Sequence, residues 1–216
     1  MPLKLFGYFR SSAAYRVRIA LKLKRLDWES ESVHLTRDGG KQFGTAYRSI
    51  NPQALVPTLQ DGPTYITQSL AIIEYLEESY PETALLPKSR KARARVRALA
   101  LSVACDIHPL NNLRVLKYLS DTLGVKDSAR MDWYRHWIST GLSALEAMLV
   151  DHPDTGSFCH GDIPGLADAC LVPQIFNASR FNCDLTTYPT ILRINKKCLE
   201  LDTFRTAAPE NQPDAE

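Results

Sequence analysis

The stretch Arg10-Ser-Ser-Ala-Ala-Tyr-Arg-Val-Arg-Ile-Ala-Leu21 is the most informative part of this sequence of 216 residues. Upstream of it, Leu3 and Leu5 alternate with polar or outward neighbours, as in a β-strand. Within it, apolar residues return at helical spacing, so we expect a helix from about Ser12 to about Lys24. A strand, a short loop and a helix start would place two hydroxyl groups and free backbone N–H groups where an anion is stabilised.

A small thiol bound at this junction would be held as its thiolate. A free thiol of the cysteine type has a pKa of about 8.5, and helix N-termini or nearby positive charge lower that value. The alternative is that Ser11 only caps the helix, because serine is a preferred N-cap residue. The residues themselves leave both roles open for Ser11 and Ser12.

The first eighty residues predict a small mixed α/β domain, because the hydrophobic period switches between 2 and 3.6. We expect a second strand over 28–35. Residues 56–59 and 64–67 flank the turn signal Asp61-Gly62 and predict a β-hairpin. Ser69 is then expected to cap a further helix.

A linker-like break follows between Pro81 and Pro87, after which strand signals nearly vanish. Helical periodicity resumes in four segments, which are 90–119, 131–150, 166–179 and 189–201. The sequence therefore predicts an α/β domain over 1–80, a linker over 81–89 and an all-helical domain over 90–216. The Pro- and acid-containing tail from Ala207 is expected to be loosely ordered.

Composition excludes several classes of protein. The net charge of +2 and pI near 8.2 give no strong field for nucleic acid or a membrane surface. No segment approaches 18 apolar residues and the N-terminus lacks a signal sequence, so we expect a cytoplasmic protein. The five cysteines form no C-x-x-C pair, which argues against a disulfide framework. The C-x-x-H spacing of Cys105 and His108 has no second ligand pair, so we expect no metal site.

Motifs for dinucleotides, P-loops, zincins and serine hydrolases are absent from the sequence, and a family resemblance supports the thiol site instead. The chain resembles the glutathione transferases, and 10–21 is similar to the zeta-class motif, which has Ser-Ser-Cys before Arg-Val-Arg-Ile-Ala-Leu. Further similar stretches cover nearly the whole chain: Asp38-Gly-Gly-Lys-Gln-Phe43, Asn51-Pro52, Val56-Pro-Thr-Leu59, Gln68–Glu77 and Ala167–Gln174.

The resemblance implies a thioredoxin-like N-terminal domain, a helical C-terminal domain, glutathione as the cofactor and a homodimer. Zeta-class proteins resemble maleylacetoacetate isomerases, and a related bacterial branch acts on maleylpyruvate. A small cis-enedioyl dicarboxylic acid is therefore the implied substrate. The implied mechanism is thiolate addition to the cis double bond, rotation and elimination to the trans acid.

The family's glutathione site is implied residue by residue. Ser11 is expected to bond the glutathione sulfur, with Ser12 beside it. Val56 precedes a proline that the fold typically holds cis, which exposes backbone groups for pairing with the cysteinyl part. Gln68 and Ser69 are expected to hold the γ-glutamyl carboxylate at a helix N-terminus. Further contacts are expected at Gln42, His108, Asn112 and Arg114.

A dicarboxylic substrate requires cations, and arginine suits carboxylates because its planar fork binds them bidentately. Arg10, Arg114 and Arg180 are the candidates, and Arg10 and Arg180 are the stronger pair because they lie in family motifs. Plain surface solvation is the alternative for each. Arg16 and Arg18, inside the first helix, are expected to serve packing or ion pairing.

Two departures from the family pattern stand out. Ala13 occupies the place of the family's cysteine, so glutathione must supply the sulfur. Gly165 occupies the first position of a capping box that ends at Asp168, and glycine offers no side-chain acceptor. Two rival functions remain: a transferase that conjugates glutathione to electrophiles, and a noncatalytic interaction module with the same fold.

Overall fold

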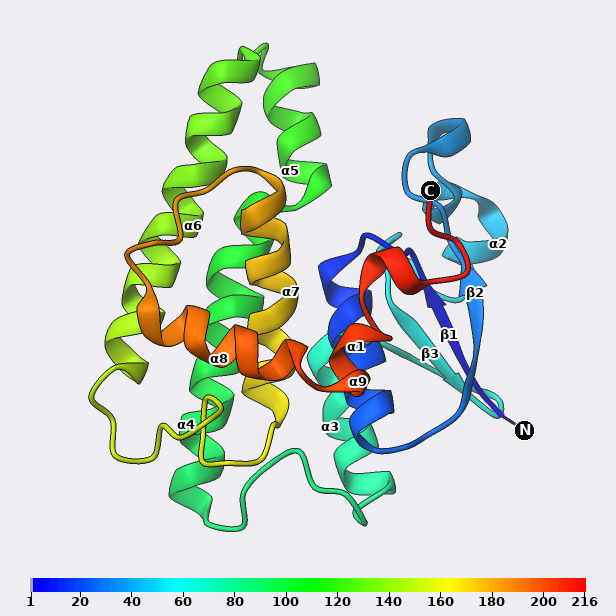
Figure 1. The fold of residues 1–216 in the computed structure, drawn as a ribbon. Coiled ribbons are helices and arrows are strands. Elements are labelled where there is room, and N and C mark those ends of the chain that lie inside the picture. The colour runs from blue at the N-terminus through cyan, green and yellow to red at the C-terminus, as the bar shows by residue number, and fades with distance from the viewer. Residues whose placement is uncertain (1) are drawn as a thin grey trace. The chain divides into compact units, whose positions relative to one another are not determined.

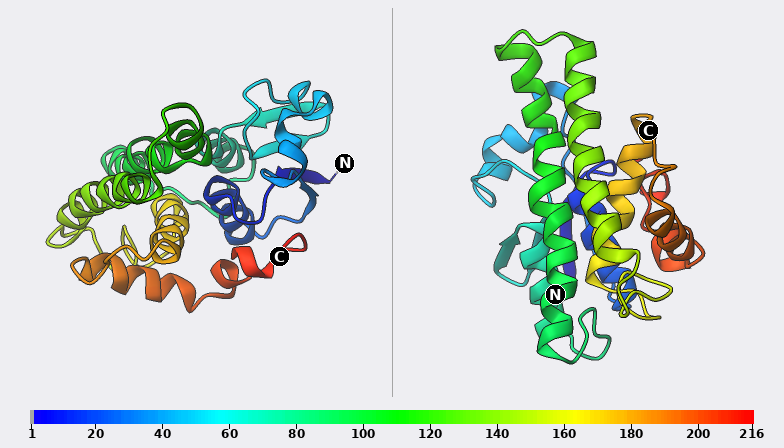
Figure 2. Two further views of the ribbon diagram at one scale, coloured as in Figure 1. Left: turned by 90° about the horizontal axis from the view of Figure 1, so that it is seen from above. Right: turned by 90° about the vertical axis from the view of Figure 1, so that its left-hand side faces the viewer.

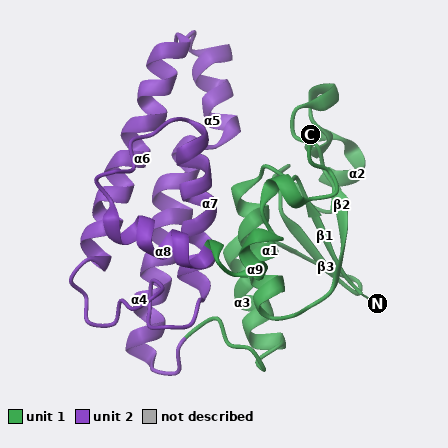
Figure 3. Ribbon diagram, viewed as in Figure 1, with its two compact units in different colours: residues 1–86, 199–216 green, residues 87–198 purple. Residues whose placement is uncertain are grey.

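The computed structural model describes residues 2–216, which divide into two compact units (Figure 3). Unit 1 comprises the chain up to Leu86 together with Leu199–Glu216, and unit 2 comprises Pro87–Cys198. The division falls inside the predicted linker 81–89. The predicted helical domain 90–216 is wrong at its C-terminal end, because residues 199–216 belong to unit 1.

Unit 1 is built on a four-stranded sheet in the order β2-β1-β3-β4. The strands are β1 (Leu3–Gly7), β2 (Trp28–Ser32), β3 (Thr58–Asp61) and β4 (Thr64–Thr67). β1 runs parallel to β2 and antiparallel to β3, and β3 and β4 form the predicted hairpin, with Asp61 opposite Thr64. Helices α1 (Ser12–Leu23) and α3 (Ser69–Ser79) pack side by side against this sheet, and the short α2 (Thr45–Arg48) lies between β2 and β3 in the chain (Figure 1). The predicted α/β domain is confirmed.

The opening strand and helix form the core of unit 1. Leu3 and Leu5 are buried on β1, as their alternation predicts. Almost the whole of α1 is buried, because the helix contacts both α3 and the short C-terminal α9 (Asp202–Arg205). The predicted helix from Ser12 to about Lys24 is confirmed.

Two boundaries in unit 1 differ from the predictions. β2 ends at Ser32 and not at Leu35, because the chain turns there and the Nδ1 atom of His34 accepts backbone hydrogen bonds from Thr36 and Arg37. The helix of residue 69 begins at Ser69, and Gln68 occupies its N-cap position. Ser69 is therefore the first helical residue and not the cap.

A buried ion pair explains why residues 81–86 belong to unit 1. The Lys24 Nζ atom lies 3.1 Å from a carboxylate oxygen of Glu77 and also donates to the carbonyl oxygens of Tyr80 and Thr83. The Glu77 carboxylate accepts hydrogen bonds from the backbone N–H groups of Leu85 and Leu86. This network ties the end of α3 and the following segment to α1.

The described residues of unit 2 form helices joined by turns, which confirms the predicted helical character. Its main helices are α4 (Arg90–Leu101), α5 (Leu113–Lys117), α6 (Asp127–Leu149), α7 (Leu166–Arg180) and α8 (Pro189–Leu199), whose last residue lies in unit 1. α7 packs against α4 in the interior of the unit (Figures 1 and 2). No helix within residues 2–216 is both long and apolar enough to cross a membrane.

The predicted single helix over 90–119 is wrong. After α4 the chain winds as a π-helical segment over Ser102–Ile107 and a 3-10 turn over His108–Asn111 before α5 begins. Pro109 lacks a backbone donor, and Asn112 has an extended backbone and caps α5. α6 also begins earlier than the predicted residue 131, whereas α7 matches the predicted 166–179 to within one residue.

Candidate functional site

The N-terminus of α1 presents the two serines of the opening motif. Ser11 is the N-cap residue, and its Oγ atom accepts a hydrogen bond of 3.2 Å from the backbone N–H of Ala14. The capping role is therefore confirmed. A hydroxyl that accepts in this way keeps its own hydrogen for donation, so the cap is compatible with a hydrogen bond to a bound sulfur. Ser12 follows as a buried residue at the first helical position.

The N-terminus of α3 lies beside α1 in the same unit. Gln68 has a positive φ of 70° with ψ 118°. Residues other than glycine rarely adopt this backbone conformation. The Gln68 Nε2 atom donates to Oε1 of Gln53 at 2.7 Å. The buried Ser69 hydroxyl accepts from Nη1 of Arg16 at 3.4 Å. A buried guanidinium therefore adds positive charge to this helix N-terminus, which favours an anion.

The loop before β3 carries the predicted cis peptide bond, between Val56 and Pro57. Two side chains hold this loop: the Tyr47 hydroxyl donates to the carbonyl oxygen of Leu55 at 2.6 Å, and the Asn51 amide donates to the same oxygen at 2.7 Å. Burial raises the pKa of Tyr47, so this phenol stays a neutral donor. No sequence signal points to Tyr47, whereas Asn51-Pro52 is one of the stretches similar to the family.

Gln42 offers a buried acceptor for a ligand. Its Nε2 atom donates to the carbonyl oxygen of Leu35 at 3.2 Å, while its buried Oε1 atom has no hydrogen-bond partner in the described protein. The φ of +100° at Gly40 favours glycine, and a Cβ atom there would lie 2.5 Å from the Gln42 side-chain amide and would displace it. An orphaned buried oxygen usually marks a missing partner, and a peptide N–H of a bound ligand fits that need.

Three further candidates lie in unit 2, close together in the chain. The Nε2 atom of His108 and the Nδ2 atom of Asn112 are 3.3 Å apart. The Asn112 Oδ1 atom accepts from the backbone N–H of Arg114, whose side chain is exposed on α5. The structure therefore brings His108 and Asn112 together.

The last candidate of unit 2, Arg180, ends α7 and is exposed. Its guanidinium lies 5.0 Å from the ring centroid of Phe181, and that ring is 4.1 Å from the ring of Tyr134. Burial raises the pKa of Tyr134, so this neighbour adds no negative charge at neutral pH. Arg180 is thus a cation presented on an aromatic platform.

Arg10 has a similar aromatic platform in unit 1. Its guanidinium lies 4.7 Å from the ring centroid of Phe9 and 5.9 Å from that of Tyr8, and its side chain is 38% exposed. An ion pair of 3.7 Å joins its Nη2 atom to Oε2 of Glu216. No local signal in the sequence predicts this pair, because the composition of the tail favours loose order. That expectation is wrong.

The inner arginines of α1 have the packing role that the sequence predicts. Arg16 reaches the start of α3, and the buried Arg18 donates to the carbonyl oxygens of Phe9 and Ala207. Among residues 2–216, no group of three or more His, Cys, Asp or Glu side chains is arranged to hold a metal ion.

Comparisons with known proteins agree on one family. The model of the glutathione S-transferase N-terminal domain matches residues 5–84. The "Probable maleylacetoacetate isomerase" of Vibrio cholerae is 52% identical over 215 residues, covering 100% of this chain and 99% of the relative. The holo structure of a maleyl pyruvate isomerase, a bacterial glutathione S-transferase of the zeta class, is 48% identical with a TM-score of 0.95, covering 99% of this chain and 100% of that one.

A third relative was solved with ligands bound. The maleylacetoacetate isomerase of Methylobacterium extorquens AM1, solved with bound malonate and glutathione, is 42% identical with a TM-score of 0.93, and the match covers 99% of each chain. Malonate is a small dicarboxylate. This relative therefore binds both a thiol ligand and a dicarboxylic ligand on the same fold.

Proposed function

We propose that this chain, which belongs to the zeta-class glutathione transferase family of maleylacetoacetate and maleylpyruvate isomerases, is a glutathione-dependent cis–trans isomerase. The observation that carries the proposal is the N-terminus of α1, where the Ser11 hydroxyl caps the helix as an acceptor and keeps its hydrogen for a sulfur. Full-length similarity to isomerases supports the reaction type.

Glutathione, when bound, supplies the sulfur nucleophile that adds to the cis double bond and is eliminated after rotation about the resulting single bond. Ser11 donates a hydrogen bond to that sulfur, and the N-terminus of α1 favours its negative charge. Ser12 lies beside it. Because Ala13 cannot act as a nucleophile, the protein contributes no thiol of its own at this position.

Four residues of unit 1 would hold the glutathione backbone. Gln68 and Ser69 bind the γ-glutamyl carboxylate at the N-terminus of α3, and Val56 pairs with the cysteinyl part through its backbone. Gln42 accepts a peptide hydrogen bond with its orphaned Oε1 atom. The family resemblance also implies glutathione contacts for His108, Asn112 and Arg114.

Arg10 and Arg180 are the proposed contacts for the substrate's carboxylates. Each presents an exposed guanidinium above an aromatic ring, which restricts the orientation of the fork without neutralising its charge. Fixing two carboxylates while the central bond turns lowers the entropic part of the barrier. Electrostatic stabilisation of the developing enolate adds to this effect.

Stoichiometry tests the reaction type directly. With maleylacetoacetate or maleylpyruvate in large excess over a small pool of glutathione, we expect complete conversion to the trans acid while free thiol stays constant. Reactions without glutathione and without enzyme control for spontaneous isomerisation. Consumption of one thiol per molecule of substrate would instead identify a conjugating transferase, and a failure to bind glutathione would favour a noncatalytic module.

Maleylacetoacetate and maleylpyruvate share the reacting group and differ in the tail that the pocket must accommodate. Comparison of kcat/KM for the two acids decides which is preferred. We further infer a homodimer in the cytoplasm, as the family resemblance implies. Sedimentation of the purified chain tests the assembly, because a single species of monomer mass would contradict it.

A further inference from the structure

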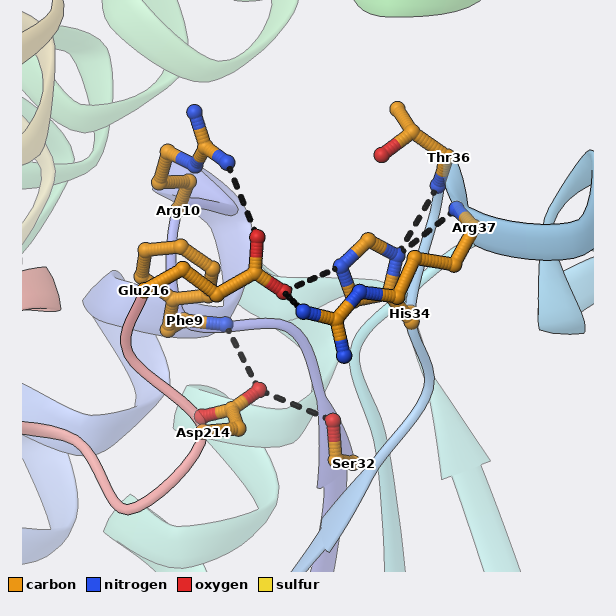
Figure 4. A network of polar contacts seen from close by, with 8 residues as sticks. All are labelled: Phe9, Arg10, Ser32, His34, Thr36, Arg37, Asp214 and Glu216. Atoms are coloured by element: carbon orange, nitrogen blue, oxygen red, sulfur yellow. Dashed lines mark hydrogen bonds and ion pairs between the residues drawn. The ribbon is translucent and has the colours of Figure 1, made fainter.

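The C-terminal segment of unit 1 brings two carboxylates onto the loop that carries Arg10 (Figure 4). We call the side chains of Asp214 and Glu216 the C-terminal clamp. Figure 4 shows the clamp between the loop after β1 and the turn after β2. Its contacts join residues 179 or more positions apart in the sequence.

Asp214 fixes the backbone immediately before Arg10. Its Oδ2 atom accepts a hydrogen bond of 3.2 Å from the backbone N–H of Phe9 and one of 2.9 Å from the Ser32 hydroxyl. The buried Arg18 donates to the carbonyl oxygen of Phe9 at 2.9 Å and to that of Ala207 at 2.9 Å. Burial lowers the pKa of Arg18 to about 10, so the guanidinium remains charged at neutral pH. The Phe9 N–H is thus tied directly to the C-terminal segment, and its carbonyl oxygen is tied to that segment through Arg18.

Glu216 is itself held on the side away from Arg10. Its Oε1 atom lies 2.8 Å from Nε2 of His34 and 2.7 Å from Nη2 of Arg37. The Nδ1 atom of His34 accepts two backbone hydrogen bonds, so in the neutral ring the proton lies on Nε2 and is donated to Glu216. This hydrogen bond, together with the positive charges of Arg37 and Arg10, lowers the pKa of Glu216. The carboxylate is ionised at neutral pH.

The second oxygen of Glu216 faces Arg10 without closing on it. The distance of 3.7 Å between Oε2 and Nη2 of Arg10 exceeds a hydrogen bond, and the Arg10 side chain remains 38% exposed. The ring under the guanidinium belongs to Phe9, whose backbone Asp214 holds. The clamp therefore fixes the backbone of the residue under the guanidinium and places a carboxylate beside one edge of it, and an external carboxylate can still reach Arg10.

We propose that the C-terminal clamp is a positioning device for Arg10, which sets the guanidinium for the carboxylate of a dicarboxylic ligand. This inference rests on the proposed function of Arg10 as a carboxylate contact. Exposed ion pairs add little to the free energy of unfolding, so the contribution of the clamp is to orient the Arg10 guanidinium. A guanidinium that is already oriented loses less entropy when it binds a carboxylate.

Malonate affinity tests the clamp without turnover, because malonate has no double bond to isomerise, so calorimetry can be run on the full chain with glutathione at saturation. We expect Glu216→Ala to weaken malonate binding by about threefold to tenfold. Glu216→Gln should bind malonate more tightly than Glu216→Ala, since its amide oxygen can still accept from His34. Both variants should leave the KM for glutathione and the melting temperature unchanged. Glu210→Gln removes a charge from the same tail outside the clamp and is the matched control.

The direction of the change in malonate affinity decides whether the clamp positions Arg10. Tighter malonate binding in both Glu216 variants would show that the carboxylate competes with the ligand, and an effect no larger than that of Glu210→Gln would show that it has no role. Either result overturns the proposal. Further weakening by Glu216→Ala in an Arg10→Ala background would also overturn it, because the clamp could not then act through Arg10.

Arg10→Ala separates this inference from the function on which it rests. If Arg10→Ala leaves malonate affinity unchanged, Arg10 is not a carboxylate contact and both ideas fail. If Arg10→Ala weakens binding and Glu216→Ala does not, the carboxylate contact stands and only the clamp is refuted.

Discussion

Helices α1 and α7 begin on different caps, and the difference separates a reactive position from a structural one. At α1 the cap is the partly exposed hydroxyl of Ser11, which accepts one hydrogen bond from Ala14. At α7 the cap position is Gly165, and the 2% exposed carboxylate of Asp168 accepts from the backbone N–H groups of Gly165 at 2.9 Å and Cys159 at 2.8 Å.

Spare capacity for hydrogen bonding is what distinguishes the two caps. The Ser11 hydroxyl keeps a donor hydrogen and can be reached by a ligand, whereas Asp168 uses both oxygens inside the protein. Burial raises the pKa of Asp168, and its backbone hydrogen bonds oppose that shift. The same local rule of helix capping therefore supports catalysis at one site and stability at the other.

The largest expected effect is that of Asp168→Ala on stability. The change leaves the buried N–H of Cys159 and the part-buried N–H of Gly165 without an acceptor, so we expect the free energy of unfolding to fall by about 2–6 kcal/mol. Urea unfolding followed by circular dichroism measures it. Asp168→Asn, which keeps one acceptor oxygen, should lose roughly half as much. A loss below about 1 kcal/mol in Asp168→Ala would contradict a structural role for this cap.

Ser11→Ala should mainly reduce catalysis. Without the hydroxyl donor we expect kcat to fall by about 100-fold, because one donor to a developing or bound anion has this order of effect. The lost cap should cost only about 1 kcal/mol of stability. Steady-state kinetics at saturating glutathione measures the first effect. Ser11→Thr keeps the hydroxyl and should retain most activity, so equal losses in both variants would point to a packing defect.

Ser11→Asp also tests the comparison of the two caps. It is the variant for which we expect the smallest change in the free energy of unfolding. Aspartate is as good an N-cap as serine, so we expect the free energy of unfolding to stay within about 0.5 kcal/mol of the wild type. Its carboxylate offers no donor and repels a thiolate, so activity should be lost. A stable and active Ser11→Asp enzyme would show that the hydroxyl is not needed.

Local sequence signals predict most of the strands and helices of unit 1. The alternation of Leu3 and Leu5, the periodicity after Ser12 and the Asp61-Gly62 turn each correspond to an observed element. Helical periodicity likewise predicts α7. The break before Asn112 was not predicted, because apolar spacing continues through Pro109 while the backbone changes its hydrogen bonding.

The C-terminal segment could not be predicted from local sequence. Its place in unit 1 depends on Arg18, His34 and the backbone of Phe9, and the hydrogen bond from Phe9 to Asp214 spans 205 positions. A tail rich in proline and acidic residues looks disordered by composition, and only the fold brings its cationic partners to it. The site serines were recognisable because their spacing and their chemistry lie within one short motif.

The pKa of bound glutathione tests most directly the claim that the α1 cap activates a thiol. Ultraviolet titration of the thiolate in the complex should give a value at least about one unit below that of free glutathione, equivalent to about 1.4 kcal/mol of preferential thiolate stabilisation. We expect this value to rise towards that of the free thiol in Ser11→Ala and to stay low in Ser11→Thr. An identical titration in wild type and Ser11→Ala would contradict the account and assign thiol activation to Ser12 or to the backbone N–H groups of α1.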